Sequence, residues 1–329
     1  MVISQTPLRI SLCGGGTDFK DYYEKNEGFV VSTAIDKYVF VIVKERFDNH
    51  IYVDYTKKEI VENINEIQHE LVREAARKTG MINGFEVSML ADIPSEGSGL
   101  GSSSSIAVGL LNAFYHYQGK QVTAEQLAQE ACEIEIDILK KPIGKQDQYI
   151  AAYGGLSSIK FNKDDTVNCK RLDLDNGFLR KLGSNLLLFF TNVTRKSSTI
   201  LTEQKAKINE NIEFHDKIKK LALQTEKYLY AGSIDKIGIV LAENWKLKKN
   251  LSSNISNEEI NKMYSLSISG GALGGKIAGA GGGGFLLTYC KRDKQDHLRE
   301  VMKDYREMPF MLEPHGSKII FNYRRYNWK

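Results

Sequence analysis

The chain has 329 residues, of which 42% are hydrophobic and 26% are charged, so it can form a large core and is neither disordered nor collagen-like. Lys and Arg number 45 and Asp and Glu 41, a formal charge of +4. Because these charges are interspersed rather than gathered in a basic arm, nucleic acid is not the expected partner. At about 150 residues per domain, the length favours two domains.

The N-terminal residues lack a basic stretch followed by an apolar one, and no run approaches the roughly 18 to 20 apolar residues of a membrane helix. We therefore expect a cytoplasmic protein with no membrane partner. The four cysteines form no C-x-x-C pair, which favours reduced thiols over a disulfide framework. The six histidines show no zinc-binding spacing, so a bound metal is expected to have oxygen ligands.

The first half of the chain predicts strands and helices in alternation. Apolar and polar side chains alternate over 1–13 and predict a strand that ends at three glycines, Gly14 to Gly16. The following segments predict a short helix over 18–25, two or three strands within 28–46 and 51–55, a helix over 64–79 and a strand over 85–93.

The second half begins with PSEGSGLGSSSS, residues 94–105, between that strand and a predicted helix over 106–117. Further helices are predicted over 123–139, where Thr123 and Gln126 form a capping box, and over 146–152, 258–267 and 294–305. Residues 196–247 have helical periodicity with one break at Gly232. Strands are predicted over 156–161, 185–191 and 285–290 and around residues 310 and 319. This order indicates an α+β fold rather than a doubly wound parallel sheet.

Gly97, Gly99 and Gly101 predict a phosphate-binding loop. Glycines allow positive φ and bring backbone N–H groups close to a ligand, and a helix N-terminus with serine hydroxyls follows directly. A flexible turn is the alternative, but a strand before the loop and an apolar helix after it favour phosphate binding. No G-x-x-x-x-G-K-[ST] sequence occurs, so the loop is not a P-loop.

A second glycine run, residues 270–284, contains Gly279, Gly281 and Gly284 at G-x-G-x-x-G spacing. A strand rather than a helix is predicted after it, which excludes a dinucleotide-binding fingerprint. Neither H-R-D nor D-F-G is present, which excludes a protein kinase. A bend where two backbones cross and a ligand-binding role both remain open for this run.

Three sequence motifs, in order, resemble those of the GHMP kinases, the superfamily that includes galactokinase, homoserine kinase and mevalonate kinase. They are PLRISLCGGGTD (7–18), PSEGSGLGSS (94–103) and KIAGAGGGGF (276–285). The resemblance implies an α+β, two-lobed GHMP kinase fold. Its lobes would be a ribosomal-protein-S5-like N-terminal domain over 1–180 and a ferredoxin-like C-terminal domain over 181–329. It also implies ATP and Mg²⁺ as cofactors, with the nucleotide and a small molecule bound between the lobes.

Within that superfamily, PLRISLCGGGTDF, AIDKYV (34–39) and TNVTRKSS (191–198) look most like the bacterial heptose kinases. Those enzymes phosphorylate C1 of D-glycero-D-manno-heptose 7-phosphate, so the resemblance implies an ATP-dependent sugar 1-kinase. Fucokinase-type domains have a similar Gly-Thr-Asp opening. A fucokinase- or galactokinase-like enzyme, and a non-catalytic sugar-binding protein of this fold, therefore remain alternatives.

The resemblance implies catalytic roles for Asp147 and Arg9. Asp147 matches the catalytic aspartate of galactokinase and mevalonate kinase, although an aspartate at a helix start is by itself more often a cap. Arg9 matches the basic residue of the first motif. It would hold Asp147 as the carboxylate and stabilise charge at the reacting oxygen, with a surface salt bridge as the alternative.

Glu135 matches the magnesium-binding glutamate of the family, and Ser103 is its expected partner, with Ser102 or Ser104 as substitutes. A carboxylate, a hydroxyl, water and phosphate oxygens form an ordinary magnesium shell. The expected ATP-binding residues are Gly97, Ser98, Gly99, Leu100, Gly101, Ser102, Ser103 and Ser104.

The expected substrate-binding residues are Gly15, Gly16, Thr17, Asp18, Arg195, Gly281 and Gly282. Thr17 and Asp18 would bind sugar hydroxyls, as this motif does in the sugar kinases, although Asp18 also suits a helix N-cap. Arg195, with Lys196, would bind a distal phosphate of the substrate, and a charged helix entrance is the alternative.

Overall fold

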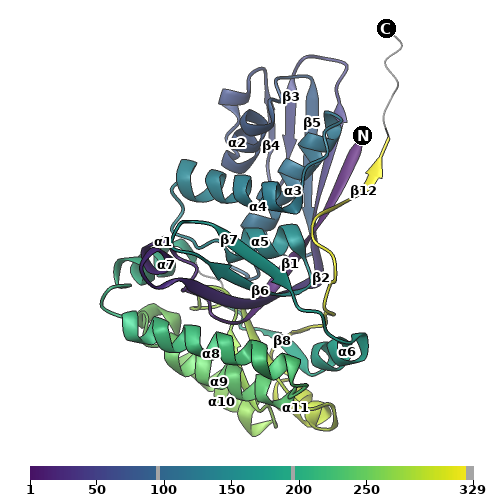
Figure 1. The fold of residues 1–329 in the computed structure, drawn as a ribbon. Coiled ribbons are helices and arrows are strands. Elements are labelled where there is room, and N and C mark those ends of the chain that lie inside the picture. The colour runs from purple at the N-terminus through teal and green to yellow at the C-terminus, as the bar shows by residue number, and fades with distance from the viewer. Residues whose placement is uncertain (94–96, 194–196, 324–329) are drawn as a thin grey trace.

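The structure is a computed structural model that describes residues 1–93, 97–193 and 197–323, and it confirms an α+β fold with two sheets (Figure 1). The first sheet has the order β12-β1-β2-β5-β3-β4, and β6 pairs with β2 and with β7. Its strands are β1 (Val2–Cys13), β2 (Gly28–Glu45), β3 (Ile51–Asp54), β4 (Lys58–Val61), β5 (Phe85–Ala91), β6 (Leu156–Phe161), β7 (Val167–Arg171) and β12 (Lys318–Asn322).

The second sheet has the order β11-β8-β10-β9. Its strands are β8 (Leu186–Phe190), β9 (Gly274–Ile277), β10 (Phe285–Tyr289) and β11 (Glu307–Met308). A boundary near residue 180 separates the strands of the two sheets except for β12, which returns to pair with β1 in the first sheet. β12 therefore belongs to the first sheet although it lies beyond residue 180.

Helices cover both sheets. They are α1 (Lys20–Asn26), α2 (Glu70–Thr79), α3 (Ser102–Tyr117), α4 (Ala124–Cys132), α5 (Gln146–Tyr153), α6 (Asn176–Ser184), α7 (Ser197–Ala206), α8 (Ile212–Tyr230), α9 (Asp235–Lys248), α10 (Glu258–Ser269) and α11 (Gln295–Val301). Short helical turns are η1 (Ile64–Glu66), the π-helical η2 (Glu133–Ile138), η3 (Ser253–Ile255) and η4 (Arg292–Lys294). In the described part of the chain, none of these helices is long and apolar enough to cross a bilayer.

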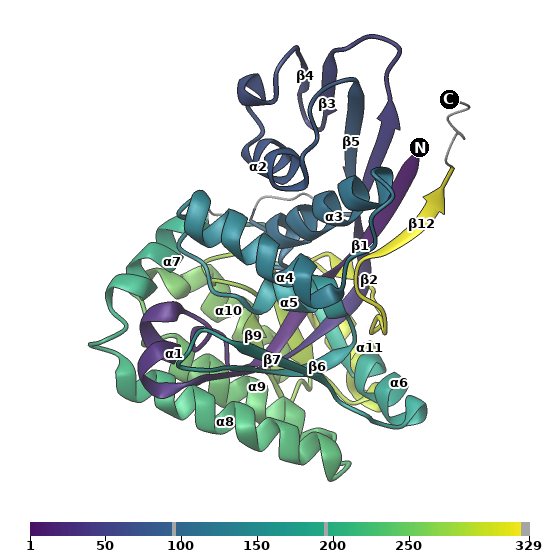
Figure 2. The ribbon, with the colours of Figure 1, turned by 45° about the horizontal axis from the view of Figure 1, so that its top comes forward.

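The burial of β1 changes along its length. Its first residues alternate between buried and half-buried, as the sequence predicts, but Thr6 to Cys13 are all buried. β1 contacts α3 and α5, and also α8 and α9 from the later part of the chain, which lie on the opposite side (Figure 1 and Figure 2). The end of β1 therefore lies deep in the molecule, and the loop that follows it starts from the interior.

Several predicted helices differ from the observed ones at their ends. The helix predicted over 64–79 is two elements, because the side chains of Asn63 and His69 each cap a separate start. The helix predicted from 106 starts at Ser102, so the serines form its first turn. The helical segment 196–247 has a second break after α7, where Ile208 packs on Phe19 and Tyr22.

The sequence did not predict β4, β7, α6 or β9. β9 lies inside the second glycine run, and three of its four residues, Gly274, Gly275 and Lys276, are poor strand formers. It forms because it pairs with β10 and because α9 packs directly on its backbone. A Cβ at Gly274 would overlap the carbonyl of Gly238 in α9, so glycine is required at this contact.

Candidate functional site

The first glycine loop has the backbone conformation that the sequence predicts. Gly97, Gly99 and Gly101 have φ of +74°, +71° and +81°, in the left-handed region that favours glycine. Gly101 is the N-cap residue of α3. A Cβ there would lie 3.1 Å from Cγ of Arg9 and 3.4 Å from Oδ2 of Asp147. The loop therefore lies directly against these two side chains.

The loop and the first turn of α3 line a cavity, here called the loop cavity. Its lining includes seven of the eight predicted ATP-binding residues, namely Gly97, Ser98, Gly99, Gly101, Ser102, Ser103 and Ser104. Leu100 differs, because its side chain is fully buried in the core and its carbonyl accepts the Arg9 N–H at 2.9 Å. Leu100 thus anchors the loop to β1.

Glu135 also lines the loop cavity and lies on the π-helical turn η2. Its carboxylate is fully buried and accepts hydrogen bonds from Oγ of Ser103 and of Ser104, both at 2.6 Å, and from Nε2 of Gln148 at 2.8 Å. The structure therefore brings Glu135 and Ser103 together, as the sequence predicts.

These oxygen groups fit the preference of Mg²⁺ for hard ligands. No cluster of three or more His, Cys, Asp or Glu ligands occurs in the described ranges, so a cation here would need phosphate and water oxygens as well. Lys141 adds positive charge to the same cavity: its Nζ donates to Oγ of Ser103 at 3.2 Å and lies 3.0 Å from Glu70. The sequence analysis did not select Lys141.

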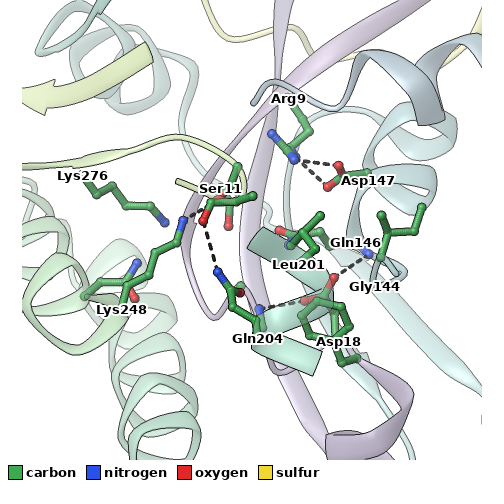
Figure 3. Close-up of a pocket in the computed structure, with 17 residues that line it drawn as sticks. Arg9, Ser11, Asp18, Gly144, Gln146, Asp147, Leu201, Gln204, Lys248 and Lys276 are labelled. Atoms are coloured by element: carbon green, nitrogen blue, oxygen red, sulfur yellow. Dashed lines mark hydrogen bonds and ion pairs between the residues drawn. The ribbon is translucent and has the colours of Figure 1, made fainter. Parts of the chain in front are cut away.

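Arg9 and Asp147 form a bidentate ion pair, which Figure 3 shows at one end of a second cavity. Nε and Nη2 of Arg9 donate to the two carboxylate oxygens of Asp147 at 2.7 and 2.6 Å. Nη1 donates to the carbonyl of Gly99 at 2.6 Å. The Arg9 side chain is only 6% exposed and that of Asp147 is 23% exposed, so this is not the surface salt bridge considered as an alternative.

This second cavity, here called the inner cavity, lies between the end of β1, α5, α7, α9 and the second glycine run. Its polar and charged lining residues are Arg9, Ser11, Asp18, Gln146, Asp147, Gln204, Asn244, Lys248 and Lys276 (Figure 3). The residues that it shares with the loop cavity include Arg9, Asp147, Gly279 and Ala280. The ion pair therefore lies where the two cavities meet.

Asp18 lies in the inner cavity, with Gly15 and Gly16 beside it. Its carboxylate accepts the N–H groups of Gly16 at 2.9 Å and of Gln146 at 3.2 Å. Burial, together with the nearby charge of Asp147, raises the pKa of Asp18 above its ordinary value. A Cβ at Gly144 would overlap this carboxylate, so the glycine after Pro142 is needed for Asp18 to fit.

Three predicted substrate-binding residues are not placed as expected. Thr17 is fully buried, and its hydroxyl donates to the carbonyl of Gly14 and accepts the N–H of Phe29, so it holds the glycine turn and is not free for a sugar. The second glycine run reaches the cavities through Gly279 and Ala280 instead of through Gly281 and Gly282.

Gly281 and Gly282 have a packing role. A Cβ at Gly281 would lie 2.9 Å from Cγ2 of Ile255, and Gly282 donates its N–H to the carbonyl of Ile255 at 2.8 Å. The predicted distal-phosphate residue, Arg195, lies outside the described residues.

The two glycine loops cross each other. A Cβ at Gly99 would lie 2.6 Å from the carbonyl oxygen of Ala278, and a Cβ at Gly279 would lie 2.6 Å from Cα of Gly99. Real Cβ atoms do not come so close to backbone, so both positions require glycine. The crossing of backbones that the sequence left open therefore occurs, and it lies beside the loop cavity and the inner cavity.

Two family models match the chain, GHMP kinases N terminal domain over residues 65–155 and GHMP kinases C terminal over residues 225–307. A curated relative, the D-glycero-alpha-D-manno-heptose 7-phosphate kinase of Campylobacter jejuni, is 31% identical over 317 residues, which cover 91% of this chain and 92% of the relative.

Two solved structures are similar over nearly the whole chain. One, a D-glycero-D-manno-heptose 1-phosphate kinase from Bacteroides thetaiotaomicron, has a TM-score of 0.83 at 24% identity and covers 98% of this chain and 100% of that chain. The other, a putative sugar kinase from Campylobacter jejuni, has a TM-score of 0.79 at 28% identity and covers 97% of each chain. The two family models and the heptose 7-phosphate kinase relative show that the chain belongs to the GHMP kinases.

Proposed function

We propose that this protein is an ATP-dependent sugar kinase that phosphorylates the anomeric hydroxyl of D-glycero-D-manno-heptose 7-phosphate and forms the 1,7-bisphosphate. The observation that carries this proposal is the Arg9–Asp147 pair at the junction of the loop cavity and the inner cavity. A nucleotide in the first and a sugar in the second would meet at this carboxylate. The C. jejuni relative, named as a heptose 7-phosphate kinase, supports the choice of sugar.

The loop cavity suits the phosphates of ATP. The loop from Gly97 to Ser104 combines glycines, whose N–H groups can approach an anion closely, with the N-terminus of α3 and its serine hydroxyls. Lys141 adds a positive charge on the same wall. These features favour a polyphosphate over an uncharged ligand.

Ser103 and Glu135 would hold Mg²⁺, with Ser104 beside them. When bound, the metal would neutralise negative charge on the β- and γ-phosphates. The inner cavity would hold the sugar, with Gly15 and Gly16 forming its floor and the Asp18 carboxylate accepting hydrogen bonds from sugar hydroxyls. A reaction that consumes ATP is consistent with the cytoplasmic location that the sequence predicts.

The proposed chemistry uses Asp147 as the general base. Its carboxylate takes the proton of the anomeric hydroxyl, the sugar oxygen forms a bond to the γ-phosphorus, and the bond from that phosphorus to the β–γ bridging oxygen breaks. The electron pair of the broken bond leaves with ADP. The two hydrogen bonds from Arg9 fix the orientation of the Asp147 carboxylate and place a positive charge beside it.

A substrate panel tests this function. The purified protein is assayed for ADP release with ATP, Mg²⁺ and each of heptose 7-phosphate, heptose, fucose, galactose and mevalonate. We expect the highest kcat/KM with heptose 7-phosphate and a product whose new phosphate is on C1, identified by phosphorus NMR. A higher kcat/KM with fucose or galactose than with heptose 7-phosphate would contradict the proposal. So would a failure of every sugar in the panel to cause ADP release.

A further inference from the structure

Two lysines that the proposed chemistry does not use lie at the end of the inner cavity opposite the Arg9–Asp147 pair (Figure 3). Lys248 is the last residue of α9, and Lys276 is in β9, so they come from different elements of the second half of the chain. They are 8% and 3% exposed, far less than is usual for this residue type.

The hydrogen-bond partners of both ammonium groups are backbone carbonyls. Lys248 donates to the carbonyls of Gly279 and Ile277, and Lys276 donates to that of Leu12 at 3.4 Å. Neither lysine forms an ion pair with a carboxylate within the described ranges. Burial of two ammonium groups without a counter-ion is costly, so the fold keeps them here at the expense of stability.

A third polar group at this end of the cavity lacks a partner. Oγ of Ser11 lines the inner cavity, is buried, and forms no hydrogen bond to any described residue. Most buried hydroxyls do have a partner. Two cations and one free hydroxyl from three separate elements therefore face the same space, a combination suited to a small anion with several oxygens.

The remaining charges of the cavity do not balance the lysines. Asp147 is paired with Arg9, and Asp18 is held by two backbone N–H groups and would face sugar hydroxyls. Because the ion pair lies at one end and the lysines at the other, a ligand that spans the cavity would carry its reacting hydroxyl at the first end and an anionic group at the second (Figure 3).

We propose that Lys248, Lys276 and Ser11 bind a phosphomonoester on the substrate, at the end remote from the hydroxyl that is phosphorylated. This inference rests on the proposed function and deepens it, because it assigns the residues that distinguish a sugar phosphate from the free sugar. A phosphate dianion matches the two ammonium charges and accepts hydrogen bonds from all three groups.

The titration of the lysines is consistent with an anion site. Burial lowers the pKa of Lys276 to about 8, while Cys13 opposes this effect and the positive charge of Arg9 across the cavity adds to it. Burial also lowers the pKa of Lys248, where Lys276 and Arg9 add to the effect and Asp18 opposes it. A bound phosphate would favour the protonated amines, so its affinity should fall as the pH rises above about 8.

The test compares two acceptors that differ only in the remote phosphate, heptose 7-phosphate and heptose. Lys248→Met and Lys276→Met should each lower kcat/KM for the phosphorylated sugar roughly 10- to 100-fold, the usual loss for a charge-assisted hydrogen bond. Their kcat/KM for heptose and their KM for ATP should stay within about threefold of the unchanged protein. Ser11→Ala should also lower kcat/KM for heptose 7-phosphate, but by a smaller factor.

Lys246→Met is the matched control, because Lys246 is exposed on the same helix. This variant should leave kcat/KM unchanged for both heptose 7-phosphate and heptose. The thermal midpoint of the Lys248→Met and Lys276→Met variants should stay the same or rise, because each removes a buried charge. The assignment would be overturned if the lysine variants lost kcat/KM equally with both acceptors or had a raised KM for ATP. It would also be overturned if Arg195→Ala, but not the lysine variants, lost the preference for heptose 7-phosphate over heptose.

Calorimetry without ATP separates this inference from the proposed function. If the protein phosphorylates no sugar, the function fails, but binding of inorganic phosphate by the unchanged protein and its loss in both lysine variants would still support the site. If heptose 7-phosphate is phosphorylated and the lysine variants keep their preference for it, the function stands and the site assignment is wrong.

Discussion

Replacement of Asp147 by asparagine removes the proposed base with little change in shape. The amide retains one acceptor oxygen for Arg9 but places an NH₂ group against the second donor, so one of the two charge-assisted hydrogen bonds is lost. Such a bond contributes about 1.5–3 kcal/mol, and Arg9, whose side chain is 6% exposed, keeps its bond to Gly99. We therefore expect a folded protein that is less stable by about 1–3 kcal/mol.

The catalytic effect of Asp147→Asn should be larger. Loss of a general base costs about 10²- to 10⁴-fold, and the Arg9 charge would lack its counter-charge beside the reacting oxygen. We expect kcat to fall about 10³-fold or more, a rise in the barrier of about 4 kcal/mol. The assay is ADP release with heptose 7-phosphate, with nucleotide affinity measured separately by a fluorescent ATP analogue and expected to stay within about threefold.

Asp173→Asn is the control for this variant, since Asp173 is exposed, and it should leave kcat unchanged. If Asp147→Asn keeps kcat within about tenfold, Asp147 is not the base, and the proposed meeting of the two cavities at this carboxylate is incorrect.

Three further predictions concern the metal, the crossing of the loops and acid stability. Glu135→Gln should raise the Mg²⁺ concentration needed for half-maximal activity at least about tenfold, and an unchanged Mg²⁺ titration would exclude this carboxylate as a ligand. Gly99→Ala should lower the free energy of unfolding by about 2 kcal/mol more than Gly232→Ala does. Gly232 is the control because its φ is similar but no atom lies within 4 Å of the new Cβ. Equal urea midpoints for the two variants would contradict the contact of Gly99 with Ala278. Burial lowers the pKa of His215, so below its ordinary value of 6.5 the unfolded state binds more protons and stability falls with falling pH. His215→Gln should reduce that fall between about pH 7.5 and about pH 5.5 in urea unfolding, and an identical slope would show that His215 does not cause it.

The glycine loop could be predicted from the sequence because its signals are local. Positive φ at Gly97, Gly99 and Gly101 follows from the absence of a Cβ, and the apolar pattern after the serines predicts the helix, although not its start at Ser102. Asp147 and Arg9 came from the family resemblance, since an aspartate after a Pro/Gly break has several structural uses. Their bidentate contact joins residues 138 apart in sequence, which no local pattern reports.

Glu135 illustrates what helical periodicity can and cannot predict. It follows the buried Cys132, Ala131, Ala128 and Leu127 by three, four, seven and eight residues, so ordinary helical spacing places it on the inward face, away from Glu133 and Asp137. The periodicity does not predict the π-helix that begins at Glu133, where Leu139 donates its N–H to the carbonyl of Ile134, five residues earlier. It does not predict the contact with Ser103 either, because that contact joins residues 32 apart in sequence.

The lysine end of the inner cavity could not be predicted because it depends on long-range packing. Lys248 lies in a segment that the sequence indicates only as helical, and many of its neighbouring lysines are exposed. Lys276 carried one usable signal, a charged residue between Gly275 and Ile277 just before a strand. That signal becomes informative only once β9 is known to lie between β10 and α9.

Arg9 makes contacts that restrict independent movement of three parts of the molecule. Its backbone N–H is bonded to Leu100, and its side chain is bonded to Gly99 and to both oxygens of Asp147. In the proposed function, a displacement of the loop on nucleotide binding would reach the carboxylate on α5 through these contacts of Arg9. The proposed base and the proposed phosphate loop are thus connected through one side chain, and in the proposed function nucleotide occupancy would affect the alignment of the attacking oxygen.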